Sequence, residues 1–357
     1  MNGRKLLFNE REQKLLELND VGAFIWCRLE DGLDRQGIIA ELVAGGLDRK
    51  TAELFFRKSA DDLARLGAIR DPNGTSRTIS RRAAAGWRQV IEIAGVPIEL
   101  RGQAADIRRS VRSLFGHLQS SSAAPVVRLV VEQSASGIDV RCANLSAVVQ
   151  APDQVMPTIK AQLTETVLQL ARYQLALHAA VLERKGRAVL IVGPPGAGKT
   201  TLCLALVAAG MTFAGDDIVL LRAGGLAQGV PFPAAVKSGS WKFERCFART
   251  LDKAPIHRRG DGQEVKYLRP RAVASGSYPI RAVILLDRRN QAAEPSLDPL
   301  HPVDALRAII AGAFTPSQAL DGAGFSSLVD GLTGADCYML SYGDPKTAAA
   351  AIGAACP

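Results

Sequence analysis

The chain has 357 residues, of which 47% are hydrophobic and 22% charged, and this balance excludes wholesale disorder. Aromatic residues make up only 5%, which argues against a stacking surface for single-stranded nucleic acid. The net charge of +9 arises entirely after residue 70, because residues 1–70 carry 12 basic and 12 acidic side chains. An excess of positive charge after residue 70 is consistent with a domain that binds a polyanionic nucleotide, and no nucleic-acid partner is needed to explain it.

The six cysteines form no C-x-x-C pair, so neither a disulfide framework nor a zinc site is expected. Residues 1–12 lack the apolar core of a signal peptide, and no apolar run is long enough to span a bilayer. We therefore expect a cytoplasmic protein with reduced thiols and no membrane partner.

Residues 4–18 predict a small hairpin whose strands cover residues 5–8 and 14–18, around a polar turn. Three helices are expected next, beginning at Asn19-Asp20, at Asp34 and at Asp48. The third is the longest, at residues 48–66. Its predicted buried stripe consists of Leu54, Phe55, Ala60, Leu63 and Leu66.

This order of elements describes a small α+β, winged-helix-like unit. The segment LELNDVGAFIWCRLEDG at residues 16–32 resembles the PqqD family, and the resemblance covers residues 4–70. It implies a domain that binds the leader of a ribosomally synthesised precursor peptide. The leader would add as a strand beside Lys14–Leu18 and pack on the helix at 48–66.

A DNA-binding winged helix is the competing interpretation of residues 1–70. It requires a basic exposed face on the third helix. In this chain the basic residues of that helix alternate with Glu53, Asp61 and Asp62, which favours peptide binding.

The predicted domains are 1–72 for the recognition unit, 73–86 for a linker, 87–157 for a β-rich shoulder and 158–357 for the catalytic domain. In the shoulder we expect a hairpin at 87–101 turning at Ala94-Gly95, a helix at 104–118, and strands at 126–132 and 138–142. A long amphipathic helix is predicted at 158–177.

A phosphate-binding loop is predicted between an apolar strand at 188–192 and a helix at 201–209. The loop has the G-x-x-x-x-G-K-[ST] pattern, as Gly193-Pro194-Pro195-Gly196-Ala197-Gly198-Lys199-Thr200, and Thr201 follows it. Its backbone N–H groups and the helix N-terminus would bind the phosphates of ATP. Lys199 would reach the β- and γ-phosphates, and the Thr200 hydroxyl would bind Mg²⁺.

Three further residues flank this loop in the sequence. His178 lies before it, and Asp216-Asp217 follow its helix directly. Adjacent carboxylates at a strand end point to opposite sides, so one can bind Mg²⁺ while the other accepts the proton of a hydroxyl. Which of the two does which stays open. His178 is expected near the γ-phosphate or the acceptor.

This histidine, loop and Asp-Asp arrangement resembles the HPr kinase/phosphorylase family, which shares its core with phosphoenolpyruvate carboxykinases. The resemblance is strong over residues 160–222 and looser over 223–345. It implies an α/β P-loop kinase domain of HPr kinase/phosphoenolpyruvate carboxykinase type, using ATP and Mg²⁺. The R-G-x-G loop and the C-terminal signature of that family are not recognised, so HPr itself is not implied as the substrate.

Downstream, the stretch P-F-P-x-x-x-K ending at Lys237 resembles a segment of HPr-kinase-related proteins and is a candidate wall of the acceptor site. Lys266 and Arg269 are further substrate candidates. They belong to a basic cluster that also contains Arg258, Arg259 and Arg271. A strand at 280–286, a helix at 302–313 and a glycine-rich tail are predicted to complete the domain.

The expected function is phosphorylation of a hydroxyl, most simply a serine, on a precursor peptide bound through its leader. Such a pairing resembles kinases that modify lasso peptides. Two alternatives stay open at this point, a kinase for free serine or a sugar, and a nucleotide-sensing regulator without enzymatic activity. Homo-oligomer formation is also left open.

Overall fold

The computed structural model describes residues 5–9, 14–18, 20–31, 33–65, 86–121, 124–241, 247–269, 271–287, 294–311, 313–314 and 320–356. The chain divides into two compact units, Met1–Arg82 and Ala83–Pro357. The division falls within the residues expected to form a linker, and each unit is described by itself. Within the described ranges, no helix has both the length and the apolar character needed to cross a membrane.

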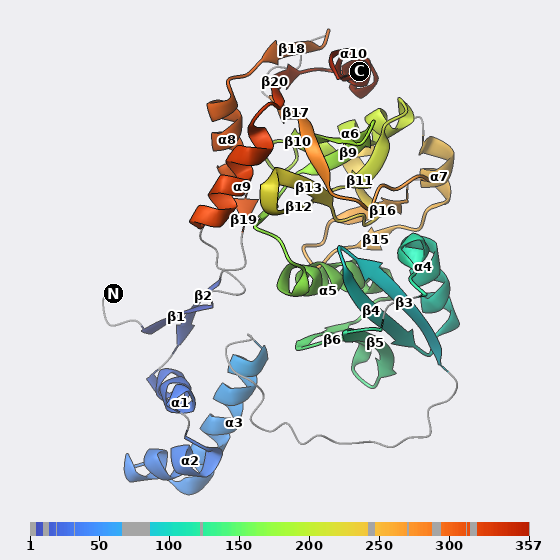
Figure 1. The fold of residues 1–357 in the computed structure, drawn as a ribbon. Helices are drawn as coiled ribbons and strands as arrows, with labels where there is room; N and C mark the ends of the chain where they lie inside the picture. The colour runs from blue at the N-terminus through green and yellow to red at the C-terminus, as the bar shows by residue number, and fades with distance from the viewer. Residues whose placement is uncertain are drawn as a thin grey trace. The chain divides into compact units, whose positions relative to one another are not determined.

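The first unit is a β-hairpin followed by three helices (Figure 1). These elements are β1 (Lys5–Asn9), β2 (Lys14–Leu18), α1 (Asp20–Glu30), α2 (Arg35–Ala44) and α3 (Arg49–Arg65). Asp34 caps α2 by accepting a hydrogen bond from the Gly37 N–H at 2.8 Å, and Asp48 caps α3 by accepting one from the Thr51 N–H at 3.0 Å. The secondary structure predicted for this unit is confirmed.

The buried face of α3 differs from the predicted stripe. The core-facing residues are Ala52, Phe56 and Ala60, which recur every four positions and pack with Ile25 and Ile38. Leu54 and Phe55 were expected inside but are 51% and 37% exposed. The predicted buried stripe was wrong at Leu54 and Phe55 because these positions do not belong to the i, i+4 series of buried residues Ala52, Phe56 and Ala60. Leu63 and Leu66 lie outside the described side chains.

The second unit begins with a five-stranded sheet of order β3-β4-β5-β6-β7. Its strands are β3 (Trp87–Ile93), β4 (Val96–Gly102), β5 (Val127–Ser134), β6 (Gly137–Cys142) and β7 (Leu145–Val149), and α4 (Ala105–Phe115) connects β4 to β5. The predicted hairpin with its turn at Ala94-Gly95 is confirmed, and both turn residues have positive φ. The edge strand β7 was not predicted.

The long helix α5 (Val155–Leu170) packs against β6 and β7 through Ile159, Leu163 and Val167. It begins before the predicted domain boundary at 157/158, so that boundary cuts through one helix. The predicted helix at 158–177 is wrong over its last part, because β8 (Leu175–Leu177) is a strand paired with β12. Short apolar runs such as this fit helix and strand equally well, and burial within the sheet decided the outcome.

The rest of the second unit is built on a ten-stranded sheet, whose main path is β11-β9-β10-β17-β13-β12-β8-β19. Off this path, β20 pairs with β17, and β18 pairs with β20. Strand β10 runs parallel to β17, and β17 runs parallel to β20. The strands are β8, β9 (Ala180–Arg184), β10 (Arg187–Val192), β11 (Thr212–Gly215), β12 (Val219–Leu221), β13 (Leu226–Gly229), β17 (Tyr278–Leu286), β18 (Ser296–Pro299), β19 (Ala313–Phe314) and β20 (Asp336–Ser341).

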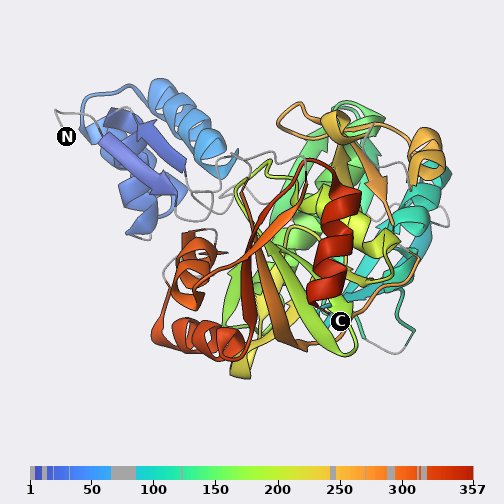
Figure 2. The same cartoon turned by 90° about the horizontal axis from the view of Figure 1, so that it is seen from above.

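Helices cover both faces of this sheet (Figure 2). Alternate residues of β10 pack into two separate cores, with Val189 and Ile191 on one side and Leu190 and Val192 on the other. The first core also contains α6 (Lys199–Ala208) and α10 (Pro345–Ala355). The second contains α8 (Pro302–Ala311) and α9 (Gly322–Leu332).

The elements after β18 differ from the helix at 302–313 and the glycine-rich tail that were expected there. Helix α8 stops at Ala311, and Ala313 belongs to β19. The segment expected to be a glycine-rich tail contains α9, β20 and α10, because small residues there let backbones pack closely. An added Cβ at Gly331 would lie 2.8 Å from the Gly225 carbonyl oxygen.

A small three-stranded sheet is inserted in the chain between β13 and β17 of the ten-stranded sheet. Its strands β14 (Ala234–Lys237), β15 (His257–Arg258) and β16 (Glu264–Leu268) pair in the order β14-β16-β15, and α7 (Ala248–Lys253) precedes β15. The turn between β15 and β16 contributes residues to the site described next.

Candidate nucleotide and phosphotransfer site

The predicted phosphate loop connects β10 to the N-terminus of α6, as expected. Gly196 and Gly198 have φ values of 79° and 98°, a region that favours glycine over any residue with a side chain. Gly198 is the N-cap of α6, and the helix begins at Lys199. The loop therefore ends where the N–H groups and the positive end of a helix are available to an anion.

Lys199 is buried, with 6% of its surface exposed. Its Nζ donates to the carbonyl oxygens of Gly193 at 2.7 Å and Pro194 at 3.3 Å, so the ammonium lies within the curve of the loop. Burial lowers the pKa of Lys199, and the nearby carboxylates of Asp217 and Asp216 oppose this shift. The cation is thus placed inside the loop, where the motif predicts that phosphates bind.

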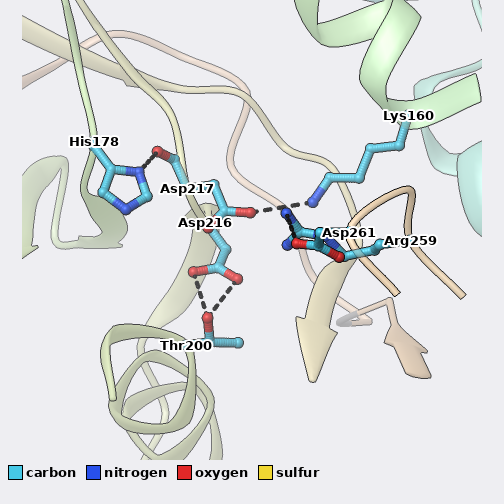
Figure 3. A network of polar contacts seen from close by, with 7 residues as sticks. All are labelled: Lys160, His178, Thr200, Asp216, Asp217, Arg259 and Asp261. Atoms are coloured by element: carbon cyan, nitrogen blue, oxygen red, sulfur yellow. Dashed lines mark hydrogen bonds and ion pairs between the residues drawn. The ribbon is translucent and has the colours of Figure 1, made fainter. Parts of the chain in front are cut away.

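The two aspartates diverge from the end of β11, as expected for adjacent residues there. Asp216 is 2% exposed and faces α6, where its Oδ1 and Oδ2 accept from the Thr200 hydroxyl at 3.1 and 3.0 Å (Figure 3). Asp217 has φ 81°, a left-handed conformation that aspartate tolerates better than most residues. This turn sends the Asp217 side chain away from Thr200.

A lysine that the sequence analysis did not single out pairs with Asp217. Lys160 of α5 donates from Nζ to Asp217 Oδ2 at 3.3 Å (Figure 3). Its side chain is only 13% exposed, and its ammonium lies 5.8 Å from the ring centroid of Tyr267 and 5.9 Å from that of Phe232. Nothing in the local sequence marks Lys160, because its partner is 57 positions away.

The environments of the two carboxyl groups shift their pKa values in opposite directions. Burial, and then the charge of Asp217, raises the pKa of Asp216 to about 7. Burial also acts to raise the pKa of Asp217, but the charges of Lys160 and His178 and the hydrogen bond from Lys160 lower it overall. At neutral pH Asp217 is therefore the ionised member of the pair, and Asp216 is close to its midpoint.

His178 lies between β8 and β9, beside the aspartates. Its Nδ1 is 3.1 Å from the carbonyl oxygen of Asp217, and because a carbonyl can only accept, Nδ1 carries the proton. Burial, followed by the charge of Lys199, lowers the pKa of His178 despite the proximity of Asp217. The neutral imidazole is favoured, and its Nε2 then has a free lone pair.

A cavity of about 300 Å³, called the phosphate cavity here, brings most of the predicted site together. Lys237, predicted as a wall of the acceptor site, lines this cavity together with Arg259 from the turn after β15. Other lining residues are His178, Pro195, Gly196, Gly198, Lys199, Thr200, Thr201, Asp217, Ala235, Val236 and Ser240. Thr201 donates from its hydroxyl to Ser240 Oγ at 3.3 Å, which ties α6 to the opposite wall.

Arg259 is a site residue that a sequence motif could have identified. Residues Arg259-Gly260-Asp261-Gly262 have the R-G-x-G spacing that the sequence analysis reported as not recognised. The Nη2 of Arg259 lies 3.2 Å from Oδ2 of Asp261 (Figure 3). Arg259 therefore places a cation beside Asp217 and on the wall of the phosphate cavity.

Lys266 and Arg269, predicted as substrate residues, do not line the phosphate cavity. Lys266 lies on β16, donates from Nζ to the Leu251 carbonyl oxygen at 2.7 Å and lies 4.7 Å from the Trp241 ring centroid. Arg269 lines two other cavities, one of them against α4 and α7. The prediction grouped them by sequence proximity, but neither Lys266, on β16, nor Arg269, directly after β16, lines this cavity.

Magnesium fits the donors at this site. Mg²⁺ is usually bound by one or two carboxylates or hydroxyls together with phosphate oxygens and water. Thr200 and Asp216 provide one hydroxyl and one carboxylate that already touch. Among the described residues no cluster of three or more His, Cys, Asp or Glu could hold a metal alone, so the nucleotide would supply the remaining ligands.

Comparisons with known proteins give little beyond this geometry. No family model matches the chain, and no curated protein matches it. A solved structure of the Hpr(Ser) kinase/phosphatase from Coxiella burnetii matches 50% of this chain and 89% of that chain, with 14% sequence identity and a TM-score of 0.23. A score this low carries no argument about function, so the conclusions below rest on the site itself.

Proposed function

We propose that this chain is an ATP-dependent kinase that transfers the γ-phosphate to a hydroxyl, most simply that of a serine, on a ribosomally synthesised precursor peptide. The observation that carries the proposal is that the adjacent carboxylates of Asp216 and Asp217 make different contacts. Asp216 contacts the phosphate-loop threonine, and Asp217 faces away from it toward Lys160 and a second cavity. A nucleotide-binding protein without chemistry needs only the first of these groups.

The residues of the chain can divide the transfer among them. The loop N–H groups and Lys199 bind the triphosphate, and Mg²⁺ on Thr200 and Asp216 would neutralise charge on the transferred group. The hydroxyl oxygen forms a bond to the γ-phosphorus while the bond from that phosphorus to the bridging oxygen breaks, and ADP leaves with the electron pair. Asp217, the ionised carboxylate, accepts the hydroxyl proton.

The first unit supports a peptide acceptor. Strand β2 is paired with β1 along one side only in the described part of the unit, so its other edge can add a further strand. On α3, Leu54 and Phe55 expose apolar surface, although large apolar side chains are normally buried. A leader with an apolar face could dock on these two features, which lie on the segments assigned to it from the sequence.

Purified protein, Mg-ATP and the peptide encoded beside its gene test the kinase. Mass spectrometry should detect the addition of one phosphate by the wild-type protein. Lys199→Ala and the double variant Asp216→Asn/Asp217→Asn should abolish it. Phosphorylation that survives either change contradicts the proposed site.

The Leu54→Asp variant tests leader guidance without removing a domain, because Leu54 is half exposed and not part of the core. We expect the KM for the full-length precursor to rise at least ~10-fold, while activity on a leaderless acceptor is unchanged. Lys58→Ala, at an exposed position of the same helix, is the matched control. Equal effects on both acceptors would favour the free-serine or sugar kinase, and steeply salt-dependent DNA binding would favour the regulator.

A further inference from the structure

A second cavity adjoins the phosphate cavity and shares part of its wall. Its volume is about 560 Å³, and it lies between α5, the first residues of β7 and the turn after β15. Asp217, Ala235 and Arg259 line both cavities. Figure 3 shows Lys160, Asp217, Arg259 and Asp261 converging at this junction.

We propose that this second cavity, named the acceptor cavity, binds the hydroxyl-bearing segment of the peptide and delivers its hydroxyl past Asp217 to the γ-phosphate. The inference rests on the proposed kinase function and extends it by locating the acceptor. Neither α5 nor β7 was assigned to the site from the sequence.

The residues shared by the two cavities place the acceptor cavity next to the expected position of the γ-phosphate, the terminal phosphate of the nucleotide. Lys199 and Thr200 of the loop motif bind the β- and γ-phosphates and their metal ion. The residues shared between the cavities include Asp217, which follows Asp216, the partner of Thr200. None of the loop glycines lines the second cavity. A molecule in it would therefore meet the γ-phosphate and not the nucleoside.

The walls of the acceptor cavity suit an extended peptide. Strand β7 is at the end of its sheet and, in the described part of the chain, pairs only with β6. Alternate residues of such an edge direct their N–H and C=O groups outward, where a peptide backbone can pair with them. Leu145, Ser146 and Ala147 of this strand line the cavity. Main-chain pairing of this kind is available to every peptide and to few small molecules.

Lys160 fixes the carboxylate at the entrance between the two cavities. Its ammonium pairs with Asp217 from the acceptor side, and the flanking rings of Tyr267 and Phe232 limit its movement. Thr158 and Thr164 add hydroxyl groups along the same wall of α5. Lys160 is thus a positioning residue that keeps Asp217 directed toward the incoming hydroxyl.

Filling the acceptor cavity tests the proposal. Ala161 is exposed on α5 and lines the cavity, so Ala161→Trp fills space without disturbing the core. Ser146→Trp does the same from the β7 wall. Gln169→Trp, at an exposed position of α5 away from the cavity, is the matched control. Thermal melts establish that each variant folds.

We expect each cavity-filling variant to raise the KM for the precursor peptide at least ~10-fold, with the Kd for ATP within ~2-fold of wild type and the control unchanged. Wild-type peptide kinetics in both folded variants would overturn the acceptor assignment and leave the kinase standing. A raised Kd for ATP would assign the cavity to the nucleoside and also overturn it. If the wild-type protein phosphorylates no peptide, the proposed function fails, and the acceptor cavity fails with it.

Discussion

The Lys160 ammonium lies 3.3 Å from Asp217 Oδ2 and joins α5 to the carboxylate that follows the phosphate-loop helix. This ion pair joins the helix beside the five-stranded sheet to the ten-stranded sheet, and apolar residues of both parts also pack in one core. The pair gives Asp217 a fixed direction and an ionised state, whereas its neighbour Asp216 faces Thr200.

Replacing Lys160 should separate catalysis from nucleotide binding. In Lys160→Met the aliphatic stem stays but Asp217 loses its cation, so we expect kcat for peptide phosphorylation to fall at least ~10-fold. The Kd for ATP, measured by calorimetry, should change less than ~3-fold because Lys160 does not line the phosphate cavity. Lys160→Arg should recover part of kcat. A parallel loss of folding and ATP binding would reduce Lys160 to a structural role.

Asp216 predicts a pH dependence of stability in the metal-free protein. Its folded-state pKa of about 7 is above that of an unfolded aspartate, so folding favours the protonated form. The stabilising contribution is complete below the unfolded pKa and disappears as the pH rises through about 7. Asp216→Asn cannot ionise, and it should exceed the wild type in unfolding free energy at pH 8 by more than ~1 kcal/mol.

Urea unfolding at pH 5 and pH 8, with EDTA present, measures this difference. At pH 5 the difference between the two proteins should be smaller than at pH 8, because the folded wild-type carboxyl still holds its proton. A wild-type protein that gains stability between these pH values relative to Asp216→Asn would contradict the raised pKa. Glu165→Gln, on the surface of α5, provides a charge-matched control for the general effect of removing one carboxylate.

His178 can be tested for its two functions separately. Asn at this position can still donate a hydrogen bond to the Asp217 carbonyl but has no ring nitrogen that accepts a proton. If His178 only supports the Asp217 turn, His178→Asn should retain kcat while His178→Ala loses it. If His178 handles a proton, both variants should lose kcat, by ~10- to 100-fold, and the pH profile should change shape. We expect the second result, because the neutral imidazole is favoured here.

A core glycine should be intolerant of even one added methyl group. A Cβ at Gly229 would lie 2.3 Å from the carbonyl oxygen of Ala214 in β11, the strand that directly precedes Asp216. Gly229→Ala should therefore lower the unfolding free energy by roughly 1–3 kcal/mol. Gly239→Ala is the control, because nothing lies within 4 Å of its added Cβ. Equal melting temperatures for the two variants would contradict the close approach of β13 and β11.

Local sequence was sufficient wherever the signal is confined to a few neighbouring residues. The phosphate loop was predicted because its glycines, lysine and threonine must be adjacent to form an anion site at a helix N-terminus. The helix caps Asp34 and Asp48 were predicted for the same reason, since a cap bonds within three positions. The divergence of Asp216 and Asp217 follows from their adjacency at a strand end.

Other features depend on contacts between distant segments, which local patterns do not encode. The buried phase of α3 follows from its packing on α1 and α2, and the Leu175–Leu177 strand from its place beside β12. Lys160 and Arg259 reach Asp217 from segments far away in the chain, so only tertiary structure places them there. The sequence by itself determined the position of the phosphate-loop motif and of the two aspartates that follow its helix. The folded chain decided which carboxylate faces Thr200, which pairs with Lys160, and which cavity lies beside that pair, because side-chain direction and charge pairing are set by long-range packing.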